Sequence, residues 1–156
     1  MRYPKSIEEI QYFWDSLFLY SMKHPNSFPK SEHLCGDKSI TKVFETGESY
    51  LCYPLRVVYL IQPLNDSETT KVLVGVPKKR FKRANKRNRI KRLMRETYRL
   101  NKHIVSDTLT EKRLQILIAF NYVSDEELDF AKIEKKMKTA LERLQQIIET
   151  YSPVIC

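Results

Sequence analysis

Glycine is scarce in this sequence, with three glycines among 156 residues. Neither G-x-x-x-x-G-K-[ST] nor G-x-G-x-x-G occurs in it. Both motifs need glycine because the backbone must approach phosphate groups closely. The sequence therefore argues against nucleotide triphosphate chemistry.

Cysteine and long apolar runs are also few. The three cysteines are widely spaced and form no C-x-x-C pair, so they suggest neither a zinc cluster nor a disulfide framework and indicate reduced thiols. The apolar cluster at 12–20 is interrupted by Asp15 and Ser16 and is shorter than a membrane span. No basic start and cleavage site precede it, so we expect a cytoplasmic protein without a transmembrane helix.

Sequence motifs typical of catalytic sites are also few. The three histidines are scattered, and neither a serine elbow nor a metal-binding motif is present. We therefore predict no catalytic residue and no metal ligand in the protein itself.

Positive charge, in contrast, is abundant and concentrated. Lysine and arginine total 28 against 19 acidic residues, for a net charge of +9. Residues 78–102 contain thirteen basic residues and one acid, Glu96, so this segment carries +12 and the rest of the chain carries −3. The basic residues are Lys78, Lys79, Arg80, Lys82, Arg83, Lys86, Arg87, Arg89, Lys91, Arg92, Arg95, Arg99 and Lys102.

Such a concentration of one charge favours a polyanionic partner, because binding releases the counterions condensed on the polyanion. Nucleic acid is the leading candidate. A solvated helix face is the alternative, although such faces usually mix both signs of charge. A membrane surface fits less well, since the segment lacks a bulky apolar face.

Hydrophobic periodicity predicts seven elements. We expect an N-terminal helix from Ser6 that ends before Pro25, and a final helix that begins at a Ser124/Glu127 capping box and ends near Thr150. Strand 114–120 is expected to be central and buried on both sides. The remaining predictions are a helix at 37–45, strands at 50–61 and 71–76 that pair as a hairpin, and a helix at 84–101 with one apolar and one cationic face. The order predicts an α+β or α/β sandwich of one small sheet with helices.

A specific motif lies within the cationic helix. Residues 87–96 read R-N-R-I-K-R-L-M-R-E, which resembles the R-N-R-x-K-R-x-x-R-E signature of the bacterial ribonuclease P protein subunit at every fixed position. Three further segments resemble that family: 28–34 (FPKSEHL), 40–44 followed by Gly47, and 74–79 (VGVPKK). The resemblance covers about residues 26–150.

The resemblance implies a fold and a function. It implies one α+β domain of about four strands, a sandwich like ribosomal protein S5 domain 2 with a left-handed βαβ crossover. We divide the chain into an N-terminal extension (1–25, an accessory helix), the family domain (26–150) and a short tail (151–156). The function implied is the protein subunit of a tRNA-processing endoribonuclease whose catalytic centre and Mg²⁺ belong to its RNA. The implied partners are that RNA and the 5′ leader of precursor tRNA, with neither DNA nor membrane.

Two sets of site residues follow from the charge pattern and the resemblance. For the leader cleft, the resemblance implies Phe44 with Ile40 as its neighbour, and Tyr50, Tyr53 and Tyr59 are weaker candidates because each could instead belong to the core. For RNA binding we expect Lys78, Lys79, Arg80, Lys82, Arg83, Lys86, Arg87, Asn88, Arg89, Lys91, Arg92, Arg95 and Arg99.

Three features depart from the family pattern. Ile40 stands where an aromatic residue is frequent, which predicts weaker leader binding. Residues 80–84 replace a glycine-containing turn. Residues 1–25 have no counterpart, so they form an accessory helix or the true start is Met22.

Two other functions stay open. A structural RNA-binding protein of the ribosomal type would bind folded RNA without any dependence on a leader. A DNA-binding protein would place the basic helix in a major groove, although no helix-turn-helix pattern accompanies that helix.

Overall fold

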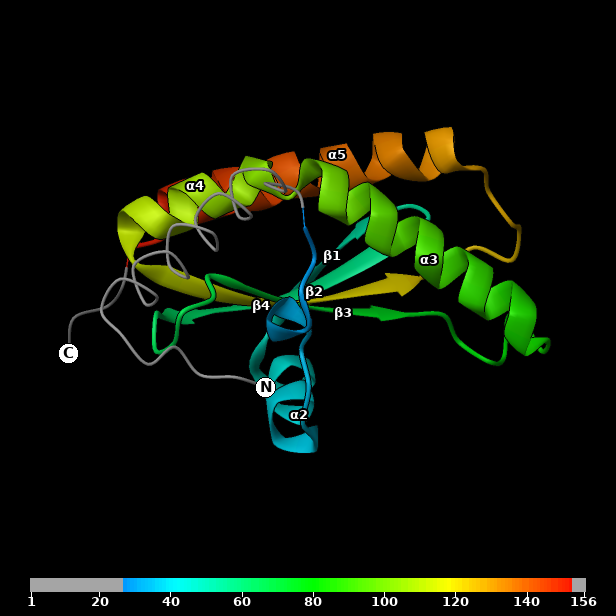
Figure 1. Cartoon of the computed structure of the whole chain (residues 1–156), viewed down its shortest axis with the longest axis horizontal. Helices are drawn as coiled ribbons and strands as arrows, with labels where there is room; N and C mark the ends of the chain where they lie inside the picture. Colours follow the sequence, from blue (N-terminus) through cyan, green and yellow to red (C-terminus); the bar gives the residue numbers. More distant parts are fainter. Residues whose placement is uncertain (1–26, 153–156) are drawn as a thin grey trace, which may run out of the picture.

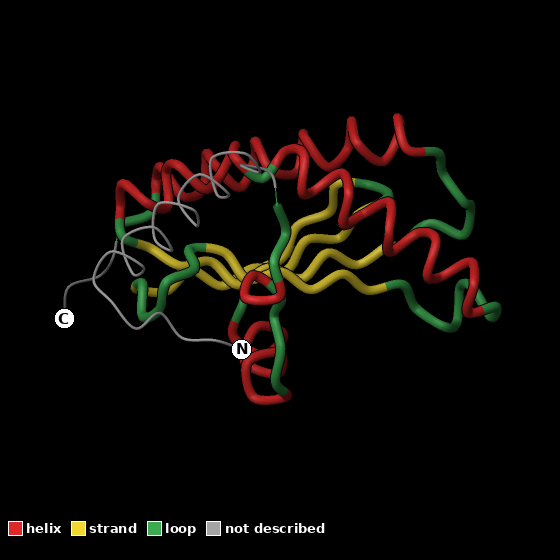
Figure 2. The backbone as a smooth tube through the Cα atoms, in the orientation of Figure 1, coloured by secondary structure: helices red, strands yellow, loops and turns green. Residues whose placement is uncertain are grey.

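The computed structural model describes residues 27–152, and the predicted N-terminal helix lies outside them. The chain forms one mixed four-stranded sheet, a large helical layer and a smaller helix on the opposite face (Figures 1 and 2). Its elements are η1 (Lys30–Glu32), α2 (Asp37–Thr46), β1 (Glu48–Cys52), β2 (Leu55–Pro63), β3 (Thr70–Gly75), α3 (Ala84–Asn101), α4 (His103–Lys112), β4 (Leu114–Tyr122) and α5 (Phe130–Thr150). The α+β prediction of about four strands is confirmed.

The strand order is β1-β2-β4-β3. β1 pairs with β2 and β2 with β4 in antiparallel register, whereas β3 pairs with β4 in parallel. The predicted hairpin between 50–61 and 71–76 is therefore wrong. The first run divides at Tyr53 and Pro54 into β1 and β2, which pair with each other. Alternation of apolar residues reveals a strand but does not specify its partner.

The parallel pair β3 and β4 is joined through α3 and α4. Figure 1 shows this connection passing over the face that α5 also covers, as a left-handed crossover. Helix α4 was not predicted, because only Ile104, Val105 and Leu109 are apolar in it, and two of them are adjacent. The segment is otherwise polar, so its pattern resembles a loop.

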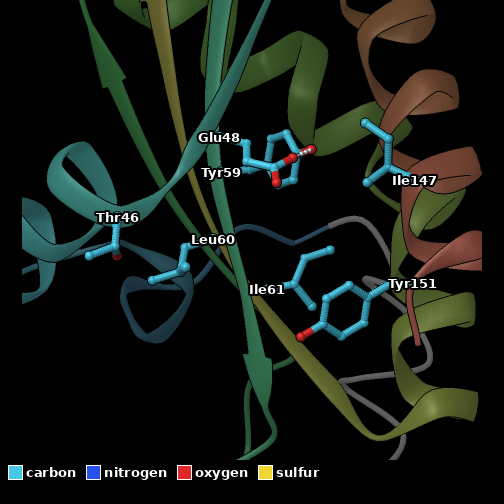
Figure 3. Close-up of a pocket in the computed structure, with 7 residues that line it drawn as sticks. All are labelled: Thr46, Glu48, Tyr59, Leu60, Ile61, Ile147 and Tyr151. Carbon is cyan, nitrogen blue, oxygen red and sulfur yellow. Dashed lines mark hydrogen bonds between the residues drawn. The ribbon is translucent and has the colours of Figure 1, made fainter. Parts of the chain in front are cut away.

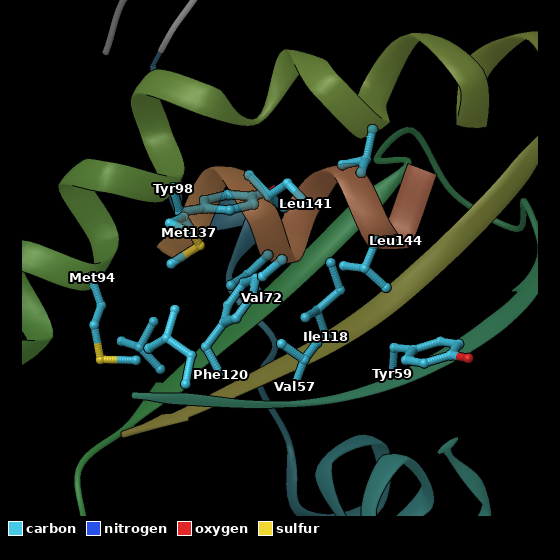
Figure 4. Packing of buried hydrophobic residues seen from close by; sticks show 14 of the residues in the cluster. Val57, Tyr59, Val72, Met94, Tyr98, Ile118, Phe120, Met137, Leu141 and Leu144 are labelled. Atoms are coloured by element: carbon cyan, nitrogen blue, oxygen red, sulfur yellow. The ribbon is translucent and has the colours of Figure 1, made fainter. Parts of the chain in front are cut away.

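The main core lies between the sheet and the layer formed by α3, α4 and α5 (Figure 4). The central position predicted for β4 is confirmed, since residues 114–120 are all buried. Tyr98 of α3 is fully buried, with its ring centroid 5.9 Å from that of Phe120 on β4. Burying a large apolar side chain contributes about 1.5–3 kcal/mol, so these contacts fix α3 firmly on the sheet.

The opposite face of the sheet carries only α2. Val43 of this helix is fully buried in a second cluster with Val58 of β2 and Leu117 of β4. Gly47 ends the helix where a Cβ atom would lie 2.3 Å from the Val43 carbonyl oxygen and 2.7 Å from that of Tyr59. Only glycine allows this close approach, so the chain can turn directly from α2 into β1.

Both ends of α5 are capped. Its N-terminus is fixed by Asp129, whose carboxylate accepts a hydrogen bond from the Lys132 amide at 3.0 Å. The predicted capping box of Ser124 and Glu127 is therefore wrong, because the N-cap is Asp129, five residues later. At the other end Lys112 Nζ donates to the Ile148 carbonyl at 2.8 Å, which satisfies part of the helix C-terminus.

Among residues 27–152, no helix is apolar and long enough to span a membrane.

Candidate nucleic-acid interface

Helix α3 separates its apolar and cationic residues as predicted. Ile90, Met94 and Thr97 are buried against the core, and Tyr98 and Asn101 join them. Leu93 and Leu100 of the same helix are half-buried. The polar side of the helix is left for solvent or a ligand.

All thirteen predicted RNA-binding residues are accessible. Ten side chains are exposed, and Arg87, Lys91 and Arg99 are half-buried. The basic loop, residues 77–83, connects β3 to α3, so its lysines and arginines adjoin the start of the cationic helix. Together they form the surface that we call the cationic face, which comprises Lys78, Lys79, Arg80, Lys82, Arg83, Lys86, Arg87, Asn88, Arg89, Lys91, Arg92, Arg95 and Arg99.

Arg87 differs from its neighbours in this face. Its Nη1 atom donates to the Phe81 carbonyl at 2.7 Å and to the Lys82 carbonyl at 2.8 Å. Phe81 is itself buried, with its ring centroid 6.0 Å from that of Tyr122. Arg87 therefore ties the basic loop to the first turns of α3 and sets the position of the loop cations.

Two acidic residues from a distant part of the sequence lie against the first half of the cationic face. Arg80 Nη1 is 2.7 Å from Asp125 Oδ1, and Lys86 Nζ is 2.9 Å from Glu127 Oε1. Arg89 Nη1 is 3.8 Å from Glu127 Oε2. Sequence reasoning missed these pairs because Asp125 and Glu127 follow β4, and only the sheet topology brings them to α3.

The second half of the face has more unpaired charge. Arg99 pairs with Glu96 of the same helix at 2.6 Å, and this contact lowers the pKa of the Glu96 carboxyl. Within residues 27–152, Lys91, Arg92 and Arg95 form no ion pair, so these three cations are available to a ligand. Arg95 also lines a cavity of about 210 Å³ with Phe28 and His33, whose ring centroids are 4.5 Å apart.

The predicted leader residues of α2 occupy one flank of that helix. Lys42 Nζ donates to Gln62 Oε1 at 3.2 Å, which directs the Lys42 flank toward the end of β2. At about 100° per residue, Ile40 and Phe44 lie on the opposite flank, one turn apart. Ile40 is half-buried and Phe44 is 48% exposed, so the Phe44 ring is available for contact.

The structure does not bring the predicted leader residues Tyr50 and Tyr59 together with Phe44. Both tyrosines belong to the main core, on the face of the sheet opposite α2. The Tyr50 hydroxyl donates to the Ala140 carbonyl at 2.7 Å, under α5. The Tyr59 hydroxyl donates to Glu48 Oε2 at 2.7 Å, beside a small cavity near the C-terminal end of α5 (Figure 3). Burial, together with this hydrogen bond, raises the pKa of Tyr59 to about 12. Alternate residues of a strand point to opposite faces, and the face could not be assigned from sequence.

Other residues take the place of those tyrosines beside α2. Arg56 of β2 and Asn121 of β4 are directly paired in the sheet and share the face of Val58, which α2 covers. Leu51 of β1, paired with Arg56, is 60% exposed on the same face. We call Phe44, Leu51, Arg56 and Asn121 the open sheet face. Because alternate residues of a strand share a face, Arg56 could have been identified from the position of Val58. The pairing of Arg56 with Asn121 depends on the register between β2 and β4, which the sequence does not reveal.

The open sheet face meets the cationic face at one end of the sheet. Gly75, the last residue of β3, is paired with Asn121, and Lys78 follows three residues later. Among the described residues, no group of three or more His, Cys, Asp or Glu side chains could hold a metal ion. The arrangement offers cations, exposed apolar side chains and the amides of Asn88 and Asn121 to a ligand.

Comparison with known proteins agrees with this geometry. The family model described as Ribonuclease P matches residues 28–145. The ribonuclease P protein component of Porphyromonas gingivalis is 46% identical over 125 residues, which cover 79% of this chain and 91% of the relative. That of Chlorobaculum tepidum is 34% identical over 111 residues, covering 67% and 72%.

The fold is also shared with solved structures. The ribonuclease P protein from Thermotoga maritima superimposes with a TM-score of 0.57 at 22% identity, covering 72% of this chain and 96% of the other. The match of the family model spans the basic helix, the sheet and most of α5. This chain belongs to the ribonuclease P protein family.

Proposed function

We propose that this chain is the protein subunit of ribonuclease P and assists cleavage of the 5′ leader from precursor tRNA. The observation that carries the proposal is the exposed cationic face over the R-N-R-x-K-R-x-x-R-E signature, held on a rigid core by Ile90, Met94 and Tyr98. The catalytic centre and its Mg²⁺ belong to the RNA subunit. The expected location is the cytoplasm.

The cationic face suits the phosphate backbone of a folded RNA. Arginine presents a planar fork of donors that matches phosphate oxygens, and Arg92 and Arg95 point their forks from the exposed side of α3. Their neutralisation of phosphates releases counterions, so affinity depends strongly on salt. We assign this face to the ribonuclease P RNA.

The open sheet face suits the single-stranded leader. An exposed aromatic ring such as Phe44 accepts any base by stacking, which fits leaders of varied sequence. Arg56 is exposed and can contact a backbone phosphate, and the Asn121 amide offers a donor and an acceptor to a base edge. Ile40 leaves one stacking position without an aromatic ring.

The test is cleavage of a precursor tRNA by a bacterial ribonuclease P RNA at near-physiological Mg²⁺, with and without this protein. Each reaction uses a precursor with a long leader and one with a trimmed leader. We expect the protein to restore cleavage, and more strongly for the long leader. A protein that binds the RNA and restores nothing would instead be a structural RNA-binding protein.

A competition assay addresses the DNA-binding alternative. The expected result is that unlabelled structured RNA displaces the labelled ribonuclease P RNA at far lower concentration than duplex DNA. Equal competition by duplex DNA would contradict the assignment.

A further inference from the structure

The loop between β4 and α5 is the most acidic segment beside the cationic face. Residues 123–129, which we call the acidic loop, contain Asp125, Glu126, Glu127 and Asp129. Asp129 caps α5. Asp125 and Glu127 pair with Arg80, Lys86 and Arg89, so three cations of the cationic face already have carboxylate partners before any RNA binds.

Hydrogen bonds that do not involve those carboxylates also hold this loop in place. The Tyr122 hydroxyl donates to the Glu126 carbonyl at 2.5 Å and accepts from the Leu128 amide at 3.2 Å. Ser124 Oγ accepts from the Glu126 amide at 3.1 Å and from the Tyr53 hydroxyl at 2.9 Å. These hydrogen bonds hold the loop at the end of the sheet, so the acids stay beside α3 for a structural reason separate from charge.

The ion pairs themselves are easily exchanged. The Asp125 side chain is 78% exposed and that of Arg89 is 74% exposed, whereas that of Glu127 is 28% exposed and divides its two oxygens between two cations. Exposed pairs of this kind are weak and are screened by salt. Phosphates of a well-fitted RNA can replace the carboxylates, whereas a poorly fitted RNA has fewer contacts to offset their loss.

We propose that Asp125 and Glu127 are specificity-determining residues that reduce binding of unrelated RNA to the cationic face. The carboxylates occupy the start of the face, and an RNA must make enough contacts elsewhere to displace them. Lys91, Arg92 and Arg95 provide those other contacts. This inference rests on the proposed function, since it concerns the same face and the same RNA.

The experiment compares two variants of the full chain that carry the same change in net charge. The test variant is Asp125→Asn with Glu127→Gln, which removes the ion pairs and keeps the shape of the side chains. The control is Glu134→Gln with Glu142→Gln on α5, where Glu134 faces Lys138 at 3.9 Å and neither acid contacts the cationic face. Thermal unfolding confirms that both are folded.

Binding is measured by titration of ribonuclease P RNA and of an unrelated RNA duplex over a range of salt concentrations. For the test variant we expect affinity for the unrelated duplex to rise roughly three- to tenfold at low salt, with a salt dependence steeper by about two units, since up to three cations become free. Affinity for ribonuclease P RNA is expected to rise less. The ratio of the two affinities, which measures selectivity, therefore falls.

A single-residue comparison refines the test. Glu126 lies between the two pairing acids and forms no ion pair among the described residues. We expect Glu127→Gln to lower selectivity and Glu126→Gln to leave it nearly unchanged.

Two results are informative in different ways. If the wild-type protein prefers ribonuclease P RNA but the test and control variants change equally, net charge alone acts and the inference is wrong. If the wild-type protein shows no preference for ribonuclease P RNA, the proposed function itself fails.

Discussion

Arg87 shows that a residue in a basic run can have a task different from its neighbours. Most arginines of the cationic face extend into solvent, but the Arg87 guanidinium donates to the Phe81 and Lys82 carbonyls. The side chain therefore positions the basic loop and the cations that it carries. In the proposed function, its effect on RNA binding is indirect.

We expect Arg87→Lys to weaken RNA binding although the charge is kept. Lysine cannot donate to both carbonyls in the same geometry, so the loop loses its attachment and the free energy of unfolding falls by about 1 kcal/mol. Urea unfolding and titration of ribonuclease P RNA measure the two effects. Arg83→Lys is the matched control, because Arg83 is exposed. Equal effects of both substitutions would show that Arg87 acts by charge alone.

The sequence identified the accessible cations correctly but could not separate their roles. Charge and helical spacing place Arg87, Arg92 and Arg95 in the same class. The distinction comes from the carbonyls within reach of each guanidinium, which depend on how the basic loop folds. The same applies to Tyr50 and Tyr59, whose burial depends on which sheet face α5 covers.

At the scale of elements, η1 is attached to the end of α3 by a largely buried ion pair. Lys102 Nζ donates to Glu32 Oε1 at 2.7 Å and also to the Ser27 carbonyl. Glu32 is 8% exposed, and its Oε2 atom has no hydrogen-bond partner. Burial raises the pKa of Glu32 above its usual value, although the hydrogen bond and charge of Lys102 oppose the shift.

This pair gives a pH dependence of defined sign. Because the folded-state pKa of Glu32 is raised above 4.5, its contribution to stability is largest below that pH and is lost as pH rises through the folded pKa. We expect the free energy of unfolding of the wild-type protein, relative to Glu32→Gln, to fall as pH increases from about 4.5 toward neutrality. Urea unfolding of both proteins over this range measures the difference. A difference that rises with pH would mean that Lys102 dominates and that the pKa is lowered.

Elements with a strong apolar period were predictable and those with a weak one were not. Helix α3 and strand β4 match their predicted residues closely, and α5 ends where predicted, because each buries a complete stripe or run. The pattern of residues 50–61 indicates one strand, because the turn at Tyr53 and Pro54 interrupts it only briefly. The pairing of strands was harder to predict than the strands themselves, because β3 pairs with β4 although α3 and α4 separate the two strands in the sequence.

At the scale of the whole molecule, the sheet separates two surfaces. The cationic face lies on the layer of α3, and the open sheet face lies beside α2 on the other side. The two meet at the end of the sheet where β3 leads into the basic loop. In the proposed function, this arrangement lets one protein contact a folded RNA and a single strand at the same time.

We expect substitutions on the two surfaces to have separate effects. Arg92→Ala should weaken binding to ribonuclease P RNA and reduce the salt dependence by about one unit, because one phosphate contact is lost. Phe44→Ala should leave that binding and the stability nearly unchanged, since the ring is half exposed, and should weaken binding of a long-leader precursor by the holoenzyme.

Affinity of the holoenzyme for long-leader and trimmed precursors distinguishes the two variants. The higher affinity that a long leader confers should be lost only with Phe44→Ala. Variants that reduce assembly and leader binding to the same extent would contradict a model with two surfaces.

The sequence by itself determined the cationic helix, the buried central strand and the family signature, because these depend on local composition and on periods of 3.6 or 2 residues. Tertiary structure decided which side chains share a face and which charges are paired. Asp125 and Glu127 reach α3 because β4 runs parallel to β3, so the segments that follow both strands lie at the same end of the sheet. Such contacts join residues about forty positions apart, and no local pattern encodes them.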